Sequence, residues 1–142
     1  MTILASHTRT VPVPADALFA RWADVDTHPE WSKGLDWTRL DGPVELGARG
    51  RLKPAGGPSW RFEVTELVAD RVFADTTYLP GARLTFRHAA EPVEGGTEVQ
   101  VSVDLSGRMS WLWTRVLGGP TALQADIEKD LRALVALLQP TS

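Results

Sequence analysis

The chain has 142 residues, of which 43% are hydrophobic and 23% charged, a balance typical of a folded globular protein and not of a disordered or membrane-embedded one. The formal net charge of -3 argues against a dedicated nucleic-acid binder, because such proteins concentrate an excess of Lys and Arg on one face. The absence of cysteine excludes disulfides, thiolate metal sites and cysteine nucleophiles.

The N-terminal part predicts one strand followed by two short helices. Residues 3–11 alternate loosely and are β-prone, which predicts a first strand. Residues 15–23, ADALFARWA, carry an apolar stripe at helical spacing, which predicts a helix. Residues 27–31, THPEW, offer Thr27 as a cap and Pro29 in the first turn, which predicts a second, very short helix.

From residue 35 onward the pattern changes from helical to strand-like. The turn sequences DGP, PAGGP, AD, PG and EGG separate six β-prone runs. The six expected strands are Leu35–Leu40, Ala48–Lys53, Ser59–Val68, Arg71–Leu79, Ala82–Ala89 and Thr97–Leu105.

The C-terminal part predicts a long helix with a break. Gly118 and Gly119 weaken the helix, and Pro120 lacks the N–H that would continue it, so we expect a kink there. The residues expected to face the sheet before the break are Met109, Leu112, Trp113, Val116 and Leu117. We expect Trp113 to be core or cavity wall. Trp111, on another side of the helix, is interpreted as covered by another element, stacked on an arginine, or exposed.

The order of these elements limits the architecture. An antiparallel sheet with one apolar face needs a cover, and only the last helix is long enough. We therefore expect an α+β protein in which a curved antiparallel sheet of about seven strands wraps around a long, kinked C-terminal helix. No repeat or linker divides the chain, so a single domain over residues 1–142 is expected.

Three segments carry a family resemblance. They read VPVPADALFARWADVDTHPEW (residues 11–31), FEVTELVADRVF (residues 62–73) and GGTEVQVSVDLSG (residues 95–107). Together they resemble the START-like, or helix-grip (SRPBCC), superfamily, specifically its polyketide cyclase/dehydrase-like branch. The resemblance implies a helix-grip fold with an apolar or amphipathic cavity between sheet and helix, and it suggests cyclase, aromatase or dehydratase chemistry as one activity.

The turn at residues 79–82, Leu-Pro-Gly-Ala, has the Pro and Gly positions of a type II turn and predicts the register of the hairpin around it. Pairing across this turn places on one side of the sheet Phe73, Asp75, Thr77, Leu84, Phe86 and His88. The other side is more polar and is expected to face water; it carries Val72, Ala74, Thr76, Tyr78, Arg83, Thr85 and Arg87. If residues 69–70 form a two-residue turn, Trp60, Phe62 and Val64 join the first side.

The first side is apolar except for Asp75, Thr77 and His88. A carboxylate on an apolar face is costly unless it is paired, and burial raises its proton affinity. We therefore take Asp75 and His88, which are diagonal neighbours, as a candidate catalytic pair for proton transfer. A one-residue shift that exposes both groups, or a satisfied polar pair inside, remain alternatives. The candidate ligand-binding residues are Trp60, Phe62, Phe73, Thr77, Phe86 and Trp113.

Three classes of function remain. The first is binding of a hydrophobic or aromatic small molecule, such as a lipid or polyketide-like metabolite. The second is a cyclase, aromatase or dehydratase acting on such a ligand. The third is an interaction module that docks a partner through the region of Trp111 or Trp37; its sign would be a filled interior together with a large apolar surface patch.

Metal, cofactor and targeting signals are absent from the sequence. The three His residues have no metal-ligand spacing, no phosphate-cradling motif occurs, and His28 in THPEW is interpreted as part of a helix entrance. We expect neither a metal nor a cofactor. With no secretory signal and no run of roughly 18 apolar residues, we expect a cytoplasmic protein without integral membrane association.

Overall fold

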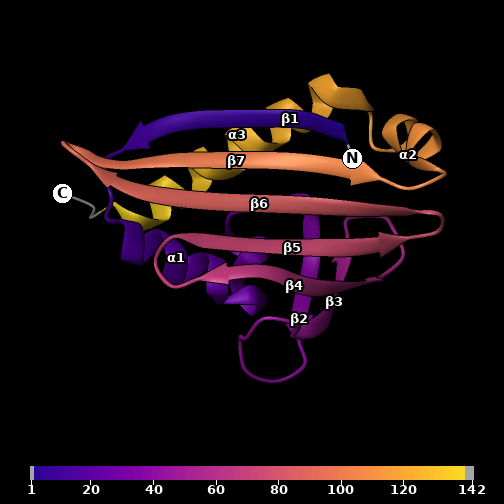
Figure 1. The fold of residues 1–142 in the computed structure, drawn as a ribbon, viewed down its shortest axis with the longest axis horizontal. Coiled ribbons are helices and arrows are strands. Elements are labelled where there is room, and N and C mark those ends of the chain that lie inside the picture. The colour runs from indigo at the N-terminus through magenta and orange to yellow at the C-terminus, as the bar shows by residue number, and fades with distance from the viewer. Residues whose placement is uncertain (1, 140–142) are drawn as a thin grey trace.

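The computed structural model describes residues 2–139, and its seven strands form one antiparallel sheet in the order β1-β7-β6-β5-β4-β3-β2 (Figure 1). In chain order the elements are β1 (Thr2–Val11), α1 (Ala15–Ala23), the 3-10 helix η1 (Val25–Glu30), β2 (Leu35–Leu40), β3 (Arg49–Pro54), β4 (Trp60–Val68), β5 (Val72–Leu79), β6 (Ala82–Val93), β7 (Gly96–Ser106), α2 (Ser110–Val116) and α3 (Gly119–Leu138). The predicted α+β helix-grip architecture is confirmed.

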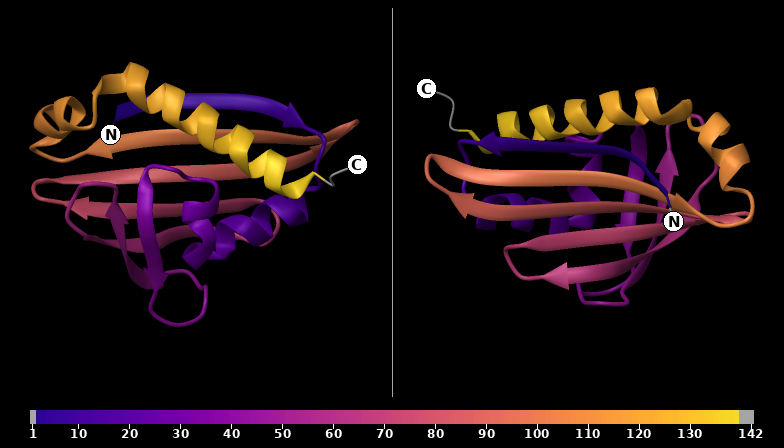
Figure 2. Two further views of the ribbon diagram at one scale, coloured as in Figure 1. Left: turned by 180° about the vertical axis from the view of Figure 1, so that it is seen from behind. Right: turned by 45° about the horizontal axis from the view of Figure 1, so that its top comes forward.

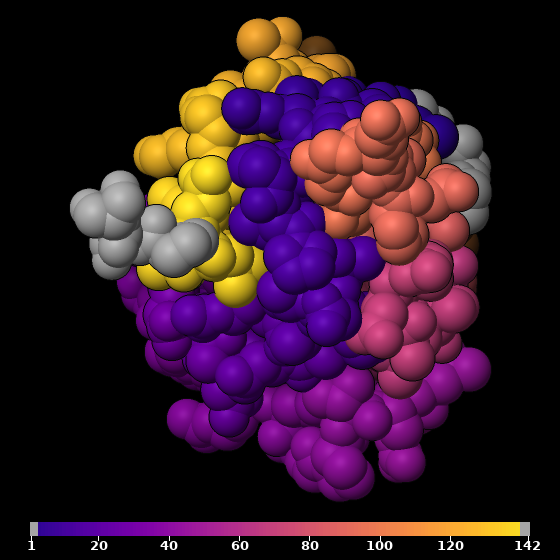
Figure 3. Space-filling model, turned by 90° about the vertical axis from the view of Figure 1, so that its left-hand side faces the viewer, coloured from indigo at the N-terminus to yellow at the C-terminus, as the bar shows by residue number. Residues whose placement is uncertain are grey.

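The long helix α3 lies across the concave face of the sheet (Figure 2). It packs mainly against β1, at one edge of the sheet. Its buried residues, Leu123, Ile127, Leu131 and Leu134, recur every three to four positions and form one apolar stripe. At the end where α3 finishes, atoms of the N-terminal segment fill the space between α3 and the hairpin of β6 and β7 (Figure 3). This end of the molecule is therefore closed.

The predicted break in the terminal helix is confirmed. Gly118 and Gly119 have φ angles of 91° and 85°, a left-handed conformation that side chains disfavour, and Pro120 follows in the first turn of α3. The predicted orientation of α2 is wrong for Leu112 and Val116, which are 37% and 61% exposed. The reason is that the break lets this short helix turn away from the axis of α3, beside the end of β7 (Figure 1), where it contacts mainly β6, β7 and α3.

Two local predictions around the strands are wrong. Thr27 does not cap the second short helix, because that helix already begins at Val25 and the Thr27 hydroxyl donates to the carbonyl of Asp24. The loop between β4 and β5 has three residues and not two, since Val68 pairs with Val72. A bulge between Val64 and Glu66 compensates for the extra residue, so Phe62 still pairs with Thr77 and Val64 with Asp75 as predicted.

The residues of β5 on the convex side of the sheet are less exposed to solvent than predicted. Ala74 and Thr76 are only 2% and 6% exposed. Ala74 lies between Glu66 and Arg87 on the neighbouring strands, and these two side chains form an ion pair of 2.7 Å. The Thr76 hydroxyl lies between those of Thr65 and Thr85, at 3.1 and 2.8 Å. The long side chains of the Glu66–Arg87 pair and the row of three Thr hydroxyls therefore cover β5 on this side.

Replacing Gly50 by Ala tests the packing behind the inner face of the sheet. A Cβ atom at Gly50 would overlap the carbonyl oxygen of Arg39 and would lie 2.8 Å from the ring of Phe62. We expect Gly50→Ala to lower the free energy of unfolding by about 1–3 kcal/mol, measured by urea denaturation. Gly34→Ala, where a Cβ meets nothing within 4 Å, is the control and should change it by less than about 0.5 kcal/mol. Equal effects of the two substitutions would contradict this packing.

Candidate functional site

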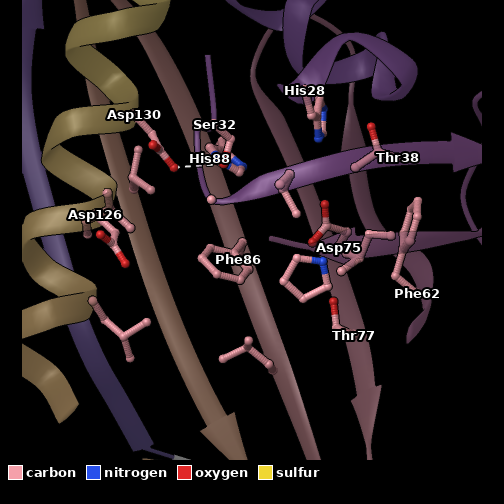
Figure 4. Close-up of a pocket in the computed structure, with 18 of the residues that line it drawn as sticks. His28, Ser32, Thr38, Phe62, Asp75, Thr77, Phe86, His88, Asp126 and Asp130 are labelled. Carbon is pink, nitrogen blue, oxygen red and sulfur yellow. Dashed lines mark hydrogen bonds between the residues drawn. The ribbon is translucent and has the colours of Figure 1, made fainter. Parts of the chain in front are cut away.

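A cavity of about 470 Å³ lies between the concave face of the sheet and α3. Its size is typical of small-molecule sites. Side chains from α1, η1, the sheet and α3 line it (Figure 4). Seven of the eight residues proposed from the sequence line this cavity: Trp60, Phe62, Asp75, Thr77, Phe86, His88 and Trp113.

Phe73 is the exception among the eight residues. It has the inward orientation expected from its register with His88, but it is fully buried and does not line the cavity. Its ring packs against those of His28 and His88, with centroids 5.9 and 6.4 Å apart. Phe73 therefore supports the cavity wall from behind.

Trp60 and Trp113 form an aromatic pair where the sheet meets the terminal helices. Their ring centroids are 5.6 Å apart and the rings are nearly perpendicular, an arrangement favoured by the charge distribution of aromatic rings. The indole N–H of Trp113 donates to the carbonyl of Pro80 at 2.8 Å. The β5–β6 turn therefore holds Trp113 in place with its apolar surface available to the cavity.

Asp75 places a carboxyl group in the apolar wall of the cavity. It lies in β5 between its cross-strand neighbours Val64 and Phe86 and is 8% exposed. Among residues 2–139 its carboxyl group has no hydrogen-bond or ion-pair partner. Burial therefore acts alone and raises the pKa of Asp75 to about 7, because the charged form loses its hydration without compensation.

His88 lies in β6 and turns its ring into the same wall. Its Nδ1 lies 3.3 Å from the carbonyl oxygen of Phe73, so Nδ1 carries the proton and Nε2 keeps a free lone pair. The rings of Trp22 and Trp31 pack on it, with centroids at 5.2 and 6.0 Å. Burial, followed by the proximity of His28, lowers the pKa of His88 to about 3, so its imidazole is neutral at neutral pH.

His28 also lines the cavity, a placement that the interpretation of THPEW as a helix entrance missed. It is 6% exposed, and its Nε2 donates to the carbonyl of Trp22 at 2.8 Å, which leaves the lone pair of Nδ1 free. Burial lowers the pKa of His28 to about 4. Its ring packs against Trp31, with centroids 5.0 Å apart. Neighbouring aromatic residues in the sequence were the available signal, but they do not reveal that η1 turns this side inward.

The cavity opens between α3 and the segment that connects η1 to β2. Lys33, Gly34 and Lys129 line the cavity there and are exposed. Across this opening the Ser32 hydroxyl donates to Oδ2 of Asp130 at 2.9 Å (Figure 4). Burial is the main cause that raises the pKa of Asp130, to about 6.

The candidate catalytic pair is brought to one wall but not into direct contact. Asp75 and His88 lie on adjacent strands, two residues apart in register, as predicted. No hydrogen bond joins them in the part of the chain that the structure describes. A proton passing between them would therefore travel through a ligand or a water molecule.

The sequence matches, over residues 2–139, the model of a family described as "Polyketide cyclase / dehydrase and lipid transport". The chain belongs to this family. It is the family whose resemblance the three sequence segments indicated, and the match extends over every element from β1 to α3. No curated protein matches the sequence.

This member of the polyketide cyclase / dehydrase and lipid transport family is similar in fold to several solved structures. Ginseng major latex-like protein 151 from Panax ginseng gives a TM-score of 0.75 at 11% identity, with 95% of this chain and 96% of that chain covered. Truncated norcoclaurine synthase from Thalictrum flavum gives 0.74 at 10% identity, covering 99% and 95%. Protein MLL2253 from Mesorhizobium loti gives 0.73 at 16% identity, covering 97% and 98%. At these identities the similarity shows the fold and nothing finer.

Metal and membrane features are absent from the described part of this family member. No group of three or more His, Asp and Glu side chains within residues 2–139 is arranged to hold a metal ion. Over the same residues, every helix is too short or too polar to cross a membrane.

Replacing Asp75 by Asn tests the electrostatics of the cavity. Because its pKa is raised from 3.8 to about 7, folding retains a proton that the unfolded chain loses, and Asp75 destabilises the protein progressively as the pH rises through this window. We expect Asp75→Asn to raise the free energy of unfolding by up to about 4 kcal/mol near pH 8 and by much less near pH 4. The lowered pKa values of the two buried histidines affect both proteins alike and cancel in the difference.

Urea denaturation at a series of pH values measures this difference. Asp41→Asn, which removes the same charge from an exposed loop, is the control and should leave the pH dependence of stability as it is in the wild type. A difference between Asp75→Asn and wild type that does not change with pH would show that Asp75 is ionised normally in the folded protein.

Proposed function

We propose that this protein binds a hydrophobic or aromatic small molecule, of the lipid or polyketide-like class, in the cavity between the sheet and α3. The observation that carries the proposal is the enclosed space of about 470 Å³ with a mainly apolar and aromatic wall. The family description, which includes lipid transport, supports it. Binding of this kind needs only a cavity of suitable shape and polarity.

The wall gives an apolar ligand a large contact surface. Four tryptophans contribute to it: Trp22, Trp31, Trp60 and Trp113. Each Å² of apolar surface that a ligand removes from water contributes about 25 cal/mol, and an unfilled cavity leaves its lining without packing partners. A ligand with an aromatic or aliphatic body therefore gains the free energy of apolar burial and also supplies packing partners for the lining side chains.

A second candidate function is catalysis of the cyclase or dehydratase type. It is favoured by one observation, a carboxyl group with a pKa near 7 and a neutral imidazole with a free lone pair in the same cavity wall. The carboxyl group can give and accept a proton at neutral pH, whereas an imidazole with a pKa of about 3 takes a proton only from a strongly acidic group. Asp75 and His88 would be the proton-transferring residues. If a polyketide-type substrate is turned over, Asp75→Asn or His88→Ala should slow the reaction while leaving binding measurable.

The third class, an interaction module, is less well supported. It requires a filled interior, whereas this interior contains the cavity. Trp111 on α2 is 61% exposed. Trp37 is half-buried, and the guanidinium of Arg39 lies 5.0 Å from the centroid of its ring. Neither residue defines a partner.

Binding of N-phenyl-1-naphthylamine, an uncharged fluorescent probe, tests the proposal. We expect saturable one-to-one binding with enhanced probe fluorescence and a raised melting temperature. Phe86→Asp should weaken binding at least about tenfold, because it places a carboxylate in the apolar wall. Val93→Asp introduces the same charge at an exposed position of the same strand and should bind the probe as the wild type does.

Two outcomes would contradict this proposal. One is the absence of saturable binding to the wild type, and the other is unchanged affinity in folded Phe86→Asp. If Phe86→Asp does not fold, Phe86→Ala replaces it, and truncation of this lining ring should still weaken binding several-fold.

A further inference from the structure

The polar groups that face the inner end of the cavity are mostly hydrogen-bond acceptors. The carboxyl group of Asp75 has no partner among residues 2–139. Nδ1 of His28 and Nε2 of His88 keep free lone pairs, because backbone carbonyls accept the protons of the other two ring nitrogens. Thr38 uses its hydroxyl proton on the carbonyl of Val25. A ligand that satisfies these groups must therefore bring donors.

The hydrogen-bond donors that line the cavity do not pair with Asp75. Within residues 2–139, the hydroxyl of Thr77 and the indole N–H of Trp22 line the cavity, and neither forms a hydrogen bond with this carboxyl group. The indole N–H of Trp31 has no partner, but its nitrogen is completely covered. The cations that line the cavity, Lys33 and Lys129, lie at the exposed opening and form no ion pair with Asp75 in residues 2–139. The carboxyl group of Asp75 therefore has neither a donor nor a counter-charge from the described part of the chain.

Aromatic rings complete the surroundings of this carboxyl group. Phe86 is its direct cross-strand neighbour, and Phe62 pairs with Thr77, two residues along β5 on the same side of the sheet (Figure 4). The faces of aromatic rings carry partial negative charge and attract cations, most strongly when water is excluded. Rings and carboxylate together favour a positively charged group and disfavour an anion.

We propose that the ligand of this cavity carries a protonated amine, which pairs with the Asp75 carboxylate among the aromatic side chains. This inference rests on the proposed binding function and names the chemical class of the ligand. The amine would donate a charge-assisted hydrogen bond to Asp75, with the two imidazole lone pairs as further acceptors. The apolar body of the ligand would lie along the remaining aromatic wall.

The other titratable groups around the cavity are compatible with a bound cation. His28 from η1 and His88 from β6 are neutral at neutral pH, because burial lowers the pKa values of both. The remaining groups that line the cavity, Lys33 before β2 and Asp126, Lys129 and Asp130 on α3, contribute two positive and two negative side chains at its opening. Within residues 2–139, no buried positive charge competes with the amine.

Three probes of one shape test the inference: 2-(1-naphthyl)ethylamine, 2-(1-naphthyl)ethanol and 1-naphthylacetate. Isothermal titration calorimetry near neutral pH should give the tightest binding for the amine, at least about tenfold tighter than the alcohol, and the weakest for the anion. In Asp75→Asn the amine and the alcohol should bind with affinities within about threefold of each other. Asp41→Asn removes an equal charge from a loop outside the cavity and should keep the full preference for the amine.

Proton exchange gives a second, independent readout. Below pH 7 the free protein holds a proton on Asp75, and pairing with an ammonium group expels it. Titrations of the wild type in buffers with different ionisation enthalpies should therefore show proton release with the amine and none with the alcohol. Asp75→Asn should release no proton with either probe.

The failure of this inference differs from the failure of the proposed function. If the alcohol binds the wild type as tightly as the amine, or if the preference for the amine persists in Asp75→Asn, the inference is overturned and the binding function stands. If none of the three probes and no N-phenyl-1-naphthylamine binds, both are overturned.

Discussion

The uneven packing of α3 on the sheet is the constraint on which the rest of the structure depends. The helix packs mainly against the β1 edge, so the inner faces of β4, β5 and β6 receive little of its side-chain surface (Figure 2). Protein interiors are normally filled to crystal-like density. Here the bulky side chains of Trp60, Phe62 and Phe86 fill only part of the space, and about 470 Å³ remains. A ligand-sized space is therefore a consequence of where the helix lies.

The same enclosure determines the charge states inside. Removal from water raises the pKa of Asp75 and lowers those of His28 and His88, so all three move toward the neutral form around neutral pH. A cavity with neutral walls is compatible with an apolar ligand. A ligand that supplies a cation changes this balance, because its charge favours the ionised form of Asp75. Electrostatics and shape thus favour one kind of molecule, apolar over most of its length and positive at one end.

Much of this arrangement could be predicted from the sequence, because some short segments specify their own geometry. The Pro80-Gly81 turn gave the pairing of β5 with β6 residue by residue, and with it the inward direction of Asp75 and His88. The β4 pairing was predicted correctly although its turn was not, since the longer loop and the bulge after Val64 cancel. Alternation along a strand indicates which side of the sheet a residue faces but not how deeply it is buried. For this reason the sequence did not predict that Phe73 lies behind the cavity wall.

Other features depend on contacts that no local pattern contains. A helical stripe shows that Leu112 and Val116 share a face with Trp113, but not whether another element covers that face. The inward direction of His28 follows from how the short helix η1 packs against Trp22 and Trp31. Such placements arise from tertiary structure, so the sequence indicated a helix entrance where the fold has a cavity wall.

The most direct test of the account is to locate a bound probe inside the protein. Nuclear Overhauser effects between N-phenyl-1-naphthylamine and labelled methyl groups would do this, because they are detected only between neighbouring protons. We expect contacts with the methyl groups of Val101, Leu123 and Leu134, which line the cavity. Contacts confined to Leu112 and Val116 on exposed α2 would contradict it, because the probe would then occupy the surface and the cavity would not be the binding site.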